Sequence, residues 1–232
     1  MAKVLAVGDL HAPFVHRNYL RFLKETQEFY QTDQTVFIGD IFDQHGLSRF
    51  IKEADAHSSY DEWEKARRVI GKYHSKFPNS DWILGNHDSR GIKKVTDSSV
   101  PESWLRTITD IYGVPTWKTS PSIEIDGVKY VHGIAAGGTS GWQDFSLKLG
   151  QSVVFGHFHS ILGTRYHRSP KGQVFSAATG CGIDEEQYAF RYAKFDPKRP
   201  VLGCQVIING RQAIPVLMDM SERRNYRIRG EK

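Results

Sequence analysis

The chain has 232 residues, of which 39% are hydrophobic and 25% charged, proportions that are typical of a soluble globular protein. It contains no apolar run near the ~20 residues that a membrane-spanning helix needs, and its first residues lack the apolar core of a signal peptide. We therefore expect a cytoplasmic protein with no membrane partner. The net charge of +5 favours anionic partners, and two cysteines are too few for a disulfide framework.

The first half of the chain alternates between strand and helix patterns. Apolar runs at 3–7, 35–38 and 81–84 stop at a glycine, as buried strands commonly do. Apolar residues recur at helical spacing in 17–30, 60–77 and 101–112, which predicts three helices. The order of these segments is a β-α-β-α-β unit followed by a third helix.

The second half is richer in strands. Apolar runs continue at 129–131 and 153–155, and the segments 122–133 and 204–220 each hold two β runs joined by Asp-Gly or Asn-Gly, as in type I′ hairpins. One mixed sheet and two packed sheets with helices outside both accommodate these halves. No linker divides the chain, so we predict a single domain, 1–220, and a basic C-terminal tail, 221–232. The tail either contacts nucleic acid or is a solvated terminus.

Five of the apolar runs end in small clusters of polar residues. In chain order the clusters are "GDLH", "GDIFD", "GNHD", "HG" and "GHFH". Ligands of open α/β sheets bind beyond the carboxyl ends of the strands, so we expect the clusters to meet at one edge. They supply Asp9, His11, Asp40, Asp43, Asn86, His87, Asp88, His132, His157 and His159. A turn or helix cap explains any one aspartate equally well, but it does not explain all five clusters.

The mixture of donors predicts transition metals. Carboxylate, amide and imidazole groups together suit Mn, Fe, Zn or Ni, whereas Mg and Ca prefer shells of oxygen alone. There are too many donors for one ion, and two ions ~3.5–4 Å apart are a recurrent device for displacement at phosphorus. We therefore expect two divalent transition metal ions, with manganese preferred over iron, zinc and nickel.

The five clusters resemble the signature of the calcineurin-like metallophosphoesterase superfamily, which reads D-x-H, G-D-x-x-D, G-N-H-D/E, H and G-H-x-H. The resemblance spans residues 9–159. It implies an α/β fold of the α+β sandwich type, in which two packed mixed β-sheets are flanked by helices in four layers. It also implies a dinuclear metal-dependent phosphoesterase, a hydrolase acting on ester bonds.

The resemblance further implies a role for each residue. One metal would be held by Asp9, His11, Asp40 and His159, and the other by Asp40, Asn86, His132 and His157, so that Asp40 bridges the ions. A bridging hydroxide would attack phosphorus. As catalytic residues, His87 would protonate the leaving oxygen and Asp88 would hold the His87 imidazole in the correct tautomer. Asp43 would fix a ligand or the turn.

Two residues beside these motifs are candidates for substrate binding. Arg90 follows "GNHD" directly, where its guanidinium either grips phosphate or forms a salt bridge across the turn. His45 lies just after "GDIFD", where it could face substrate. The protein Ser/Thr phosphatases of the superfamily have an arginine where this chain has Gln44, which argues against a protein phosphatase activity.

Three functions remain open. We favour a phosphodiesterase or phosphatase that acts on a small or exposed phosphorylated molecule. A nuclease or nucleic-acid end-processing enzyme would use the same site, and the positive net charge agrees with it. The third is a non-catalytic scaffold with a metal-binding crevice. Metal binding does not require His87, so the presence of this residue favours an enzyme.

Overall fold

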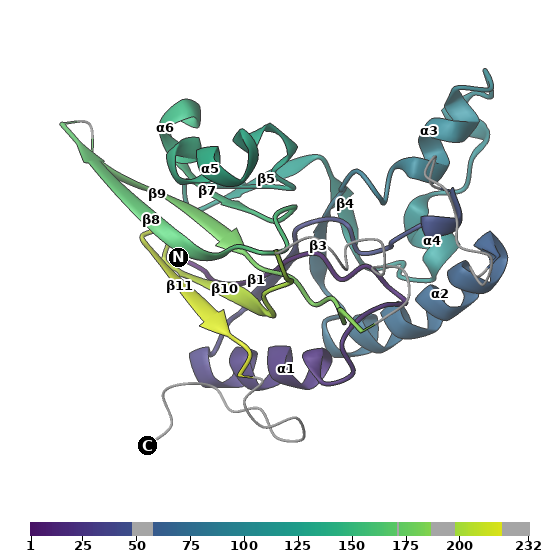
Figure 1. Ribbon diagram of the computed structural model, residues 1–232, viewed down its shortest axis with the longest axis horizontal. Helices are drawn as coiled ribbons and strands as arrows, with labels where there is room; N and C mark the ends of the chain where they lie inside the picture. Colours follow the sequence, from purple (N-terminus) through teal and green to yellow (C-terminus); the bar gives the residue numbers. More distant parts are fainter. Residues whose placement is uncertain (48–57, 171, 187–197, 220–232) are drawn as a thin grey trace.

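The computed structural model describes residues 1–47, 58–170, 172–186 and 198–219, and in this part of the chain two β-sheets pack face to face (Figure 1). The first sheet has the strand order β11-β10-β1-β2-β3-β4. Its strands are β1 (Lys3–Val7), β2 (Gln34–Phe37), β3 (Ser80–Ile83), β4 (Lys118–Ser120), β10 (Gly203–Ile208) and β11 (Gln212–Leu217). Strands β1 to β4 are parallel, and β10 and β11 extend the sheet in antiparallel pairs.

The second sheet has the strand order β5-β6-β7-β9-β8. Its strands are β5 (Ser122–Ile125), β6 (Val128–Val131), β7 (Ser152–Phe155), β8 (Leu162–Ser169) and β9 (Gly172–Thr179). Both predicted hairpin turns are confirmed, because Asp126-Gly127 and Asn209-Gly210 connect paired strands with positive φ at both residues.

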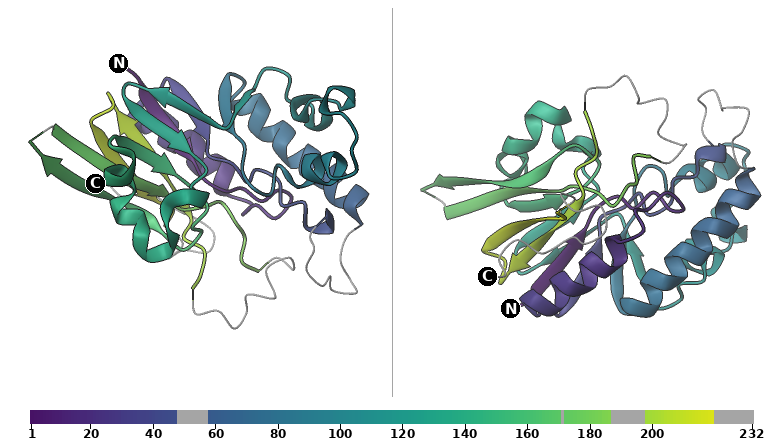
Figure 2. Two further views of the ribbon diagram at one scale, coloured as in Figure 1. Left: turned by 90° about the horizontal axis from the view of Figure 1, so that it is seen from above. Right: turned by 60° about the horizontal axis from the view of Figure 1, so that its bottom comes forward.

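The hairpin of β8 and β9 was missed in the sequence. Its tip extends away from the rest of the fold (Figure 2). Accordingly, β9 is exposed where it begins and buried only in its second half. The tip lies outside the core, so its residues carry no apolar pattern that would identify a strand.

Alternate residues of the central strands serve different layers. In β1, Leu5 and Val7 pack in the core beneath the helices, whereas Val4 and Ala6 pack in the core between the two sheets. Side chains of a strand point alternately to opposite faces, and here both faces are covered. Residues 4–7 are therefore all apolar, without the alternation of a half-exposed strand.

Helices cover the outer faces of both sheets. Against the first sheet pack α1 (Tyr19–Tyr30), α2 (Ser59–Lys76) and α4 (Ile108–Tyr112), and against the second packs α6 (Phe145–Leu149), with the short α5 (Gly138–Gly141) beside it. Figure 1 shows α1 and α6 on opposite sides of the paired sheets. Four layers result, so the predicted fold class is confirmed.

The single helix predicted over 101–112 is wrong. The segment instead forms a 3₁₀ turn, η2 (Glu102–Trp104), and the separate helix α4. Thr107 between them has extended φ and ψ of −61° and 150°, and its hydroxyl accepts a hydrogen bond from Asp110 N at 3.2 Å. Such a capping threonine starts a new helix because it satisfies a free backbone N–H group.

The remaining short elements are η1 (His45–Leu47), α3 (Arg90–Thr96), η3 (Ile134–Ala136) and η4 (Trp142–Asp144). Among the described helices, none is both long and apolar enough to cross a membrane. The predicted basic tail, 221–232, lies outside the described residues. The division into one domain and a tail therefore stays a prediction.

Candidate metal centre

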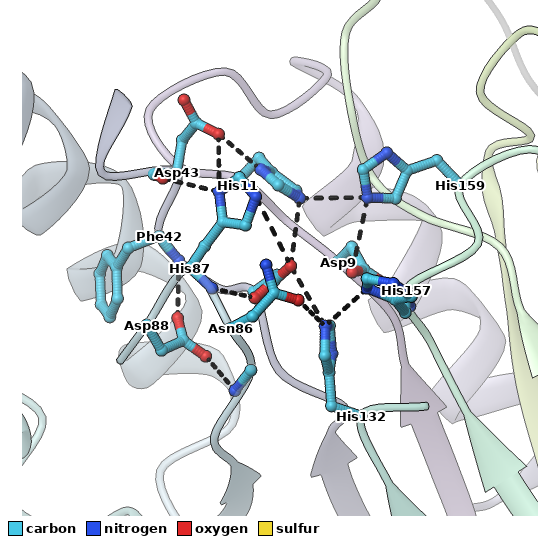
Figure 3. Close-up of polar contacts among 12 residues, drawn as sticks. Asp9, His11, Phe42, Asp43, Asn86, His87, Asp88, His132, His157 and His159 are labelled. Atoms are coloured by element: carbon cyan, nitrogen blue, oxygen red, sulfur yellow. Dashed lines mark hydrogen bonds and ion pairs between the residues drawn. The ribbon is translucent and has the colours of Figure 1, made fainter. Parts of the chain in front are cut away.

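The predicted donor residues meet where strands of both sheets end (Figure 3). Asp9 and His11 follow β1, Asp40 follows β2, Asn86 follows β3, His132 follows β6, and His157 and His159 follow β7. Two glycines permit this convergence: a Cβ at Gly85 would collide with Asp40, and a Cβ at Gly156 would collide with Asp9. The glycines of "GNHD" and "GHFH" therefore let neighbouring loops reach the two carboxylates.

The backbone at this edge is unusual. His11, Asp40, Gln44 and His157 have φ values of 48°, 46°, 49° and 70°. Positive φ is uncommon in residues other than glycine, and such conformations cluster at functional sites where the surrounding structure enforces them. Here a backbone hydrogen bond of 2.9 Å from His11 N to Asp40 O ties the first two loops together.

One cluster of possible ligands consists of Asp9, His11 and His159. His11 Nε2 lies 3.2 Å from His159 Nε2, which in turn lies 3.6 Å from Asp9 Oδ1. Asp9 Oδ2 accepts a hydrogen bond from His157 N at 2.8 Å. Asp9 Oδ1 is buried and has no hydrogen-bond partner among the described residues. A buried carboxylate oxygen without a donor is costly, and a cation at this point would satisfy it.

A second cluster consists of Asp40, His132 and His157, and Asn86 adjoins it. His132 Nε2 lies 3.2 Å from both Asp40 Oδ2 and His157 Nδ1, and 3.0 Å from Asn86 Oδ1. Asp40 Oδ2 also lies 3.8 Å from His11 Nε2 in the first cluster. The Asp40 carboxylate therefore stands between the two clusters.

Hydrogen bonds on the far side of two rings fix the direction of their lone pairs. His11 Nδ1 lies 2.7 Å from Asp43 Oδ1, and His132 Nδ1 lies 2.9 Å from the carbonyl oxygen of Ile38. Both oxygens are acceptors, so each Nδ1 carries the proton and each Nε2 faces the centre. This arrangement is typical of histidines that bind a metal. Together with the orphaned oxygen of Asp9, it fits a divalent transition metal.

The buried Asp40 carboxylate and the His132 imidazole stabilise each other's charged forms. Burial raises the pKa of Asp40, but its hydrogen bond with His132 and the nearby histidine charges outweigh this and lower the pKa. Burial likewise lowers the pKa of His132, but Asp40 and Asp9 raise it to about 10. His132 therefore carries a second proton, on Nε2, in the metal-free protein. A metal ion bound there must displace that proton.

Asp43 and not Asp88 holds His87. His87 Nδ1 lies 2.7 Å from the carbonyl oxygen of Asp43 and 3.2 Å from its Oδ1. Since the carbonyl can only accept, Nδ1 donates and Nε2 is left for chemistry. Burial lowers the pKa of His87, but Asp43 and Asp40 raise it above its ordinary value. The orienting role assigned to Asp88 is thus wrong, and the same Asp43 carboxylate contacts both His11 and His87.

The Asp88 carboxylate points into the protein beneath the site (Figure 3). It accepts hydrogen bonds from Phe42 N at 3.1 Å, Trp82 Nε1 at 3.1 Å and Gly85 N at 2.9 Å. Burial and the charge of Asp40 raise its pKa to about 6, against these three bonds. Asp88 is adjacent to His87 in sequence, but it serves to fix the loops around the site.

Both candidate substrate-binding residues lie beside Asp43, and Arg90 also contacts His87. Arg90 Nη2 lies 2.8 Å from His87 Nε2, and Arg90 Nη1 donates to Asp43 O at 3.0 Å. His45 Nδ1 lies 3.9 Å from Asp43 Oδ2, and its side chain is mostly buried. Arginine can only donate, so its contact with Nε2 requires that nitrogen to be unprotonated.

Sequence reasoning missed two residues that support the site. The buried carboxylate of Glu62 contacts the turn η1, and the amide of Gln44 contacts α3. A glutamate in the first turn of a helix is common, because it is favourable near the helix N-terminus, and so gave no distinctive signal. A third possible metal cluster, His11, Asp40 and His87, was also not foreseen.

Comparisons with known proteins agree with the motifs. The sequence model described as calcineurin-like phosphoesterase matches residues 2–171, and no curated protein matches the chain. Similar solved structures include Vacuolar Protein Sorting 29 from Cryptosporidium parvum, with 13% identity, a TM-score of 0.46, and 98% of this chain and 95% of that chain covered. They also include the phosphoesterase YfcE from E. coli, with 13% identity, a TM-score of 0.44, and 97% and 96% covered.

The nuclease MPE of Pseudomonas putida is similar at 14% identity and a TM-score of 0.34, with 91% of this chain and 85% of that chain covered. The family match rests on the sequence itself. It contains the five motifs from "GDLH" to "GHFH", whose side chains meet at one site. The chain belongs to the calcineurin-like phosphoesterase family.

Proposed function

We propose that the protein is a metal-dependent phosphoesterase that hydrolyses a phosphodiester or phosphomonoester, with His87 as the general acid. The observation that carries this proposal is the position of Asp40 Oδ2, which lies 3.2 to 4.0 Å from Nε2 of His132, His11 and His87. One carboxylate oxygen thereby joins both ligand clusters to the candidate proton donor. A scaffold that only binds metal has no need of the third contact.

The ligands fall into two sets that share Asp40. Asp9, His11, Asp40 and His159 would hold one ion, and Asp40, Asn86, His132 and His157 would hold the other. Such ions, manganese preferred, would supply a nucleophile from water at neutral pH and neutralise charge on phosphate oxygens. Binding of an ion at the second set would release a proton, because His132 must first lose the Nε2 proton that it shares with Asp40.

His87 and Arg90 would act in turn. While Arg90 donates to His87 Nε2, that nitrogen can carry no proton. A phosphate group that draws the guanidinium away frees Nε2 to be protonated. Asp43 keeps the opposite ring nitrogen fixed throughout. Arg90 would thus grip the phosphate oxygens, and His87 would give its proton to the leaving oxygen.

A metal-reconstituted activity panel tests the proposal. Chelator-treated protein receives Mn²⁺, Zn²⁺ or Ca²⁺ and is assayed on p-nitrophenyl phosphate, bis-p-nitrophenyl phosphate, cyclic nucleotides and oligonucleotides. We expect turnover with Mn²⁺ above that with Ca²⁺, because imidazole-rich sites disfavour calcium. Activity confined to oligonucleotides would identify the nuclease alternative. Tight metal binding without turnover on any substrate would favour the alternative of a non-catalytic scaffold with a metal-binding crevice.

A further inference from the structure

Glu62 is a buried carboxylate on a helix that supplies no metal ligand. It lies on the stripe of α2 formed by Glu62, Ala66, Ile70 and Tyr73, all of which are buried. Its side chain accepts hydrogen bonds from two consecutive backbone groups, His45 N at 2.7 Å on Oε1 and Gly46 N at 2.7 Å on Oε2. Both oxygens are therefore committed to the turn η1.

The backbone carbonyl of Asp43, just before this turn, contacts both side chains that we propose act on the substrate. The carbonyl oxygen of Asp43 accepts from His87 Nδ1 at 2.7 Å and from Arg90 Nη1 at 3.0 Å. Only Gln44 separates this carbonyl from the N–H groups that Glu62 binds. Any rotation of the turn would move the acceptor that sets the direction of both side chains.

Gln44 makes the turn dependent on support from outside. Its φ of 49° is unfavourable for a residue other than glycine, so the surrounding contacts must hold it. Its side-chain Oε1 accepts from Gly91 N in α3 at 2.9 Å, and its Nε2 donates to Asp88 O, just before α3, at 3.2 Å. Glu62 holds the turn from α2, and Gln44 holds it against the start of α3.

We propose that Glu62 is a positioning residue, which fixes the peptide groups after Asp43 and so aims His87 and Arg90 at the substrate. This inference rests on the proposed phosphoesterase function. Glu62 lies in none of the possible ligand clusters, so its effect is on turnover and phosphate binding and not on metal content. Charge-assisted bonds to two successive N–H groups hold a turn more firmly than neutral ones.

The test uses Glu62→Gln in the full chain. The substitution keeps the size of the side chain, but its NH₂ group faces a backbone N–H group, so one of the two hydrogen bonds is lost. The matched control is Glu64→Gln on the same helix, which affects only exposed contacts, with Arg68 and with the Tyr60 hydroxyl. Gln44→Ala is a second variant that loosens the turn from the α3 side.

We expect Glu62→Gln to lower kcat on an alkyl phosphoester by about 10- to 100-fold, since small misplacements of catalytic groups have effects of this size. The loss on p-nitrophenyl esters should be smaller, because that leaving group needs no proton. Added to His87→Ala, the same change should cost less than it does in the wild-type background, because the contribution made through His87 is already gone and only that made through Arg90 remains. Equal losses on both esters would show that the change has no effect through His87 and would overturn the proposal.

NMR separates this proposal from the proposed function. Spectra of the full chain with Zn²⁺ should show the amide signals of His45 and Gly46 and the Nδ1–H signal of His87 moved in Glu62→Gln and unmoved in Glu64→Gln. If wild-type protein hydrolyses no ester, the proposed function fails, and these signals alone decide the role of Glu62. An unmoved His87 signal in Glu62→Gln and Gln44→Ala would refute the positioning role.

Discussion

The site has a metal half, formed by the proposed ligands, and a proton-donor half, formed by His87 and Arg90, and the two are held in different ways. The proposed ligands Asp9, His132 and His157 follow strand ends, and glycine contacts bring their loops together. His87 and Arg90, by contrast, are held by contacts from Asp43, which adjoins a turn that is braced by the Glu62 side chain of α2 and by the turn's own Gln44 side chain against α3. The metal half therefore depends on the sheets, and the proton-donor half depends on a few side-chain bonds. Substitutions should separate metal content from turnover.

The largest effect is expected from Asp40→Asn, which attacks the group common to both halves. It removes the charge that stands between the ligand clusters, so both metal ions should bind weakly and activity should vanish. Elemental analysis of the purified variant measures the loss. Two tightly retained ions per chain would rule out the shared role of Asp40.

His87→Ala should break only the proton-donor half. Metal content should stay near that of wild type, while turnover of alkyl or nucleotide esters falls by ~10²–10⁴-fold, the range typical of general acid catalysis. Aryl esters should lose less, because p-nitrophenolate leaves without a proton. The ratio of kcat for the two substrate types is the measurement. A variant that lost one metal would instead place His87 among the ligands, as its cluster with His11 and Asp40 allows.

Asp43→Asn and Asp88→Asn sharpen the comparison. Asp43 contacts His11 and His87, so the Asp43→Asn variant should lose about 10- to 100-fold in activity or metal affinity, which is the usual effect of removing a residue that orients a metal ligand.

In Asp88→Asn the new NH₂ group faces N–H donors, which should lower the free energy of unfolding by about 1–3 kcal/mol. Thermal unfolding and ester selectivity, measured on both variants, distinguish the two roles. Altered selectivity in Asp88→Asn alone would restore the role first assigned to it.

A pH titration probes the metal half by itself. The pKa of His132 is raised from 6.5 to about 10 in the metal-free fold, so its stabilising effect is complete below pH 6.5 and is lost as the pH rises toward 10. In that window the free energy of unfolding should fall by at most about 1.4 kcal/mol per pH unit for this one proton. Metal affinity should rise over the same window, because the metal competes with the proton. Calorimetric titrations between pH 6 and 9 check both, and a His132→Gln variant whose stability kept the same slope would contradict the assignment.

The sequence alone determined that the central strands are buried and which side chains meet at one edge, whereas the four layers followed only from the family resemblance. Apolar runs such as 4–7 are buried on both faces, and glycine-led clusters at four of the five strand ends specify where loops approach closely. The tertiary structure decided which carboxylate serves which histidine. Asp88 is next to His87 in the chain, but it turns toward Trp82, and Asp43 from another loop takes its place. Adjacency in sequence does not set side-chain direction when a turn intervenes, because φ and ψ at each residue decide it. Glu62 is the same case at longer range, since only the packing of α2 against η1 brings its carboxylate to the peptide groups that it binds.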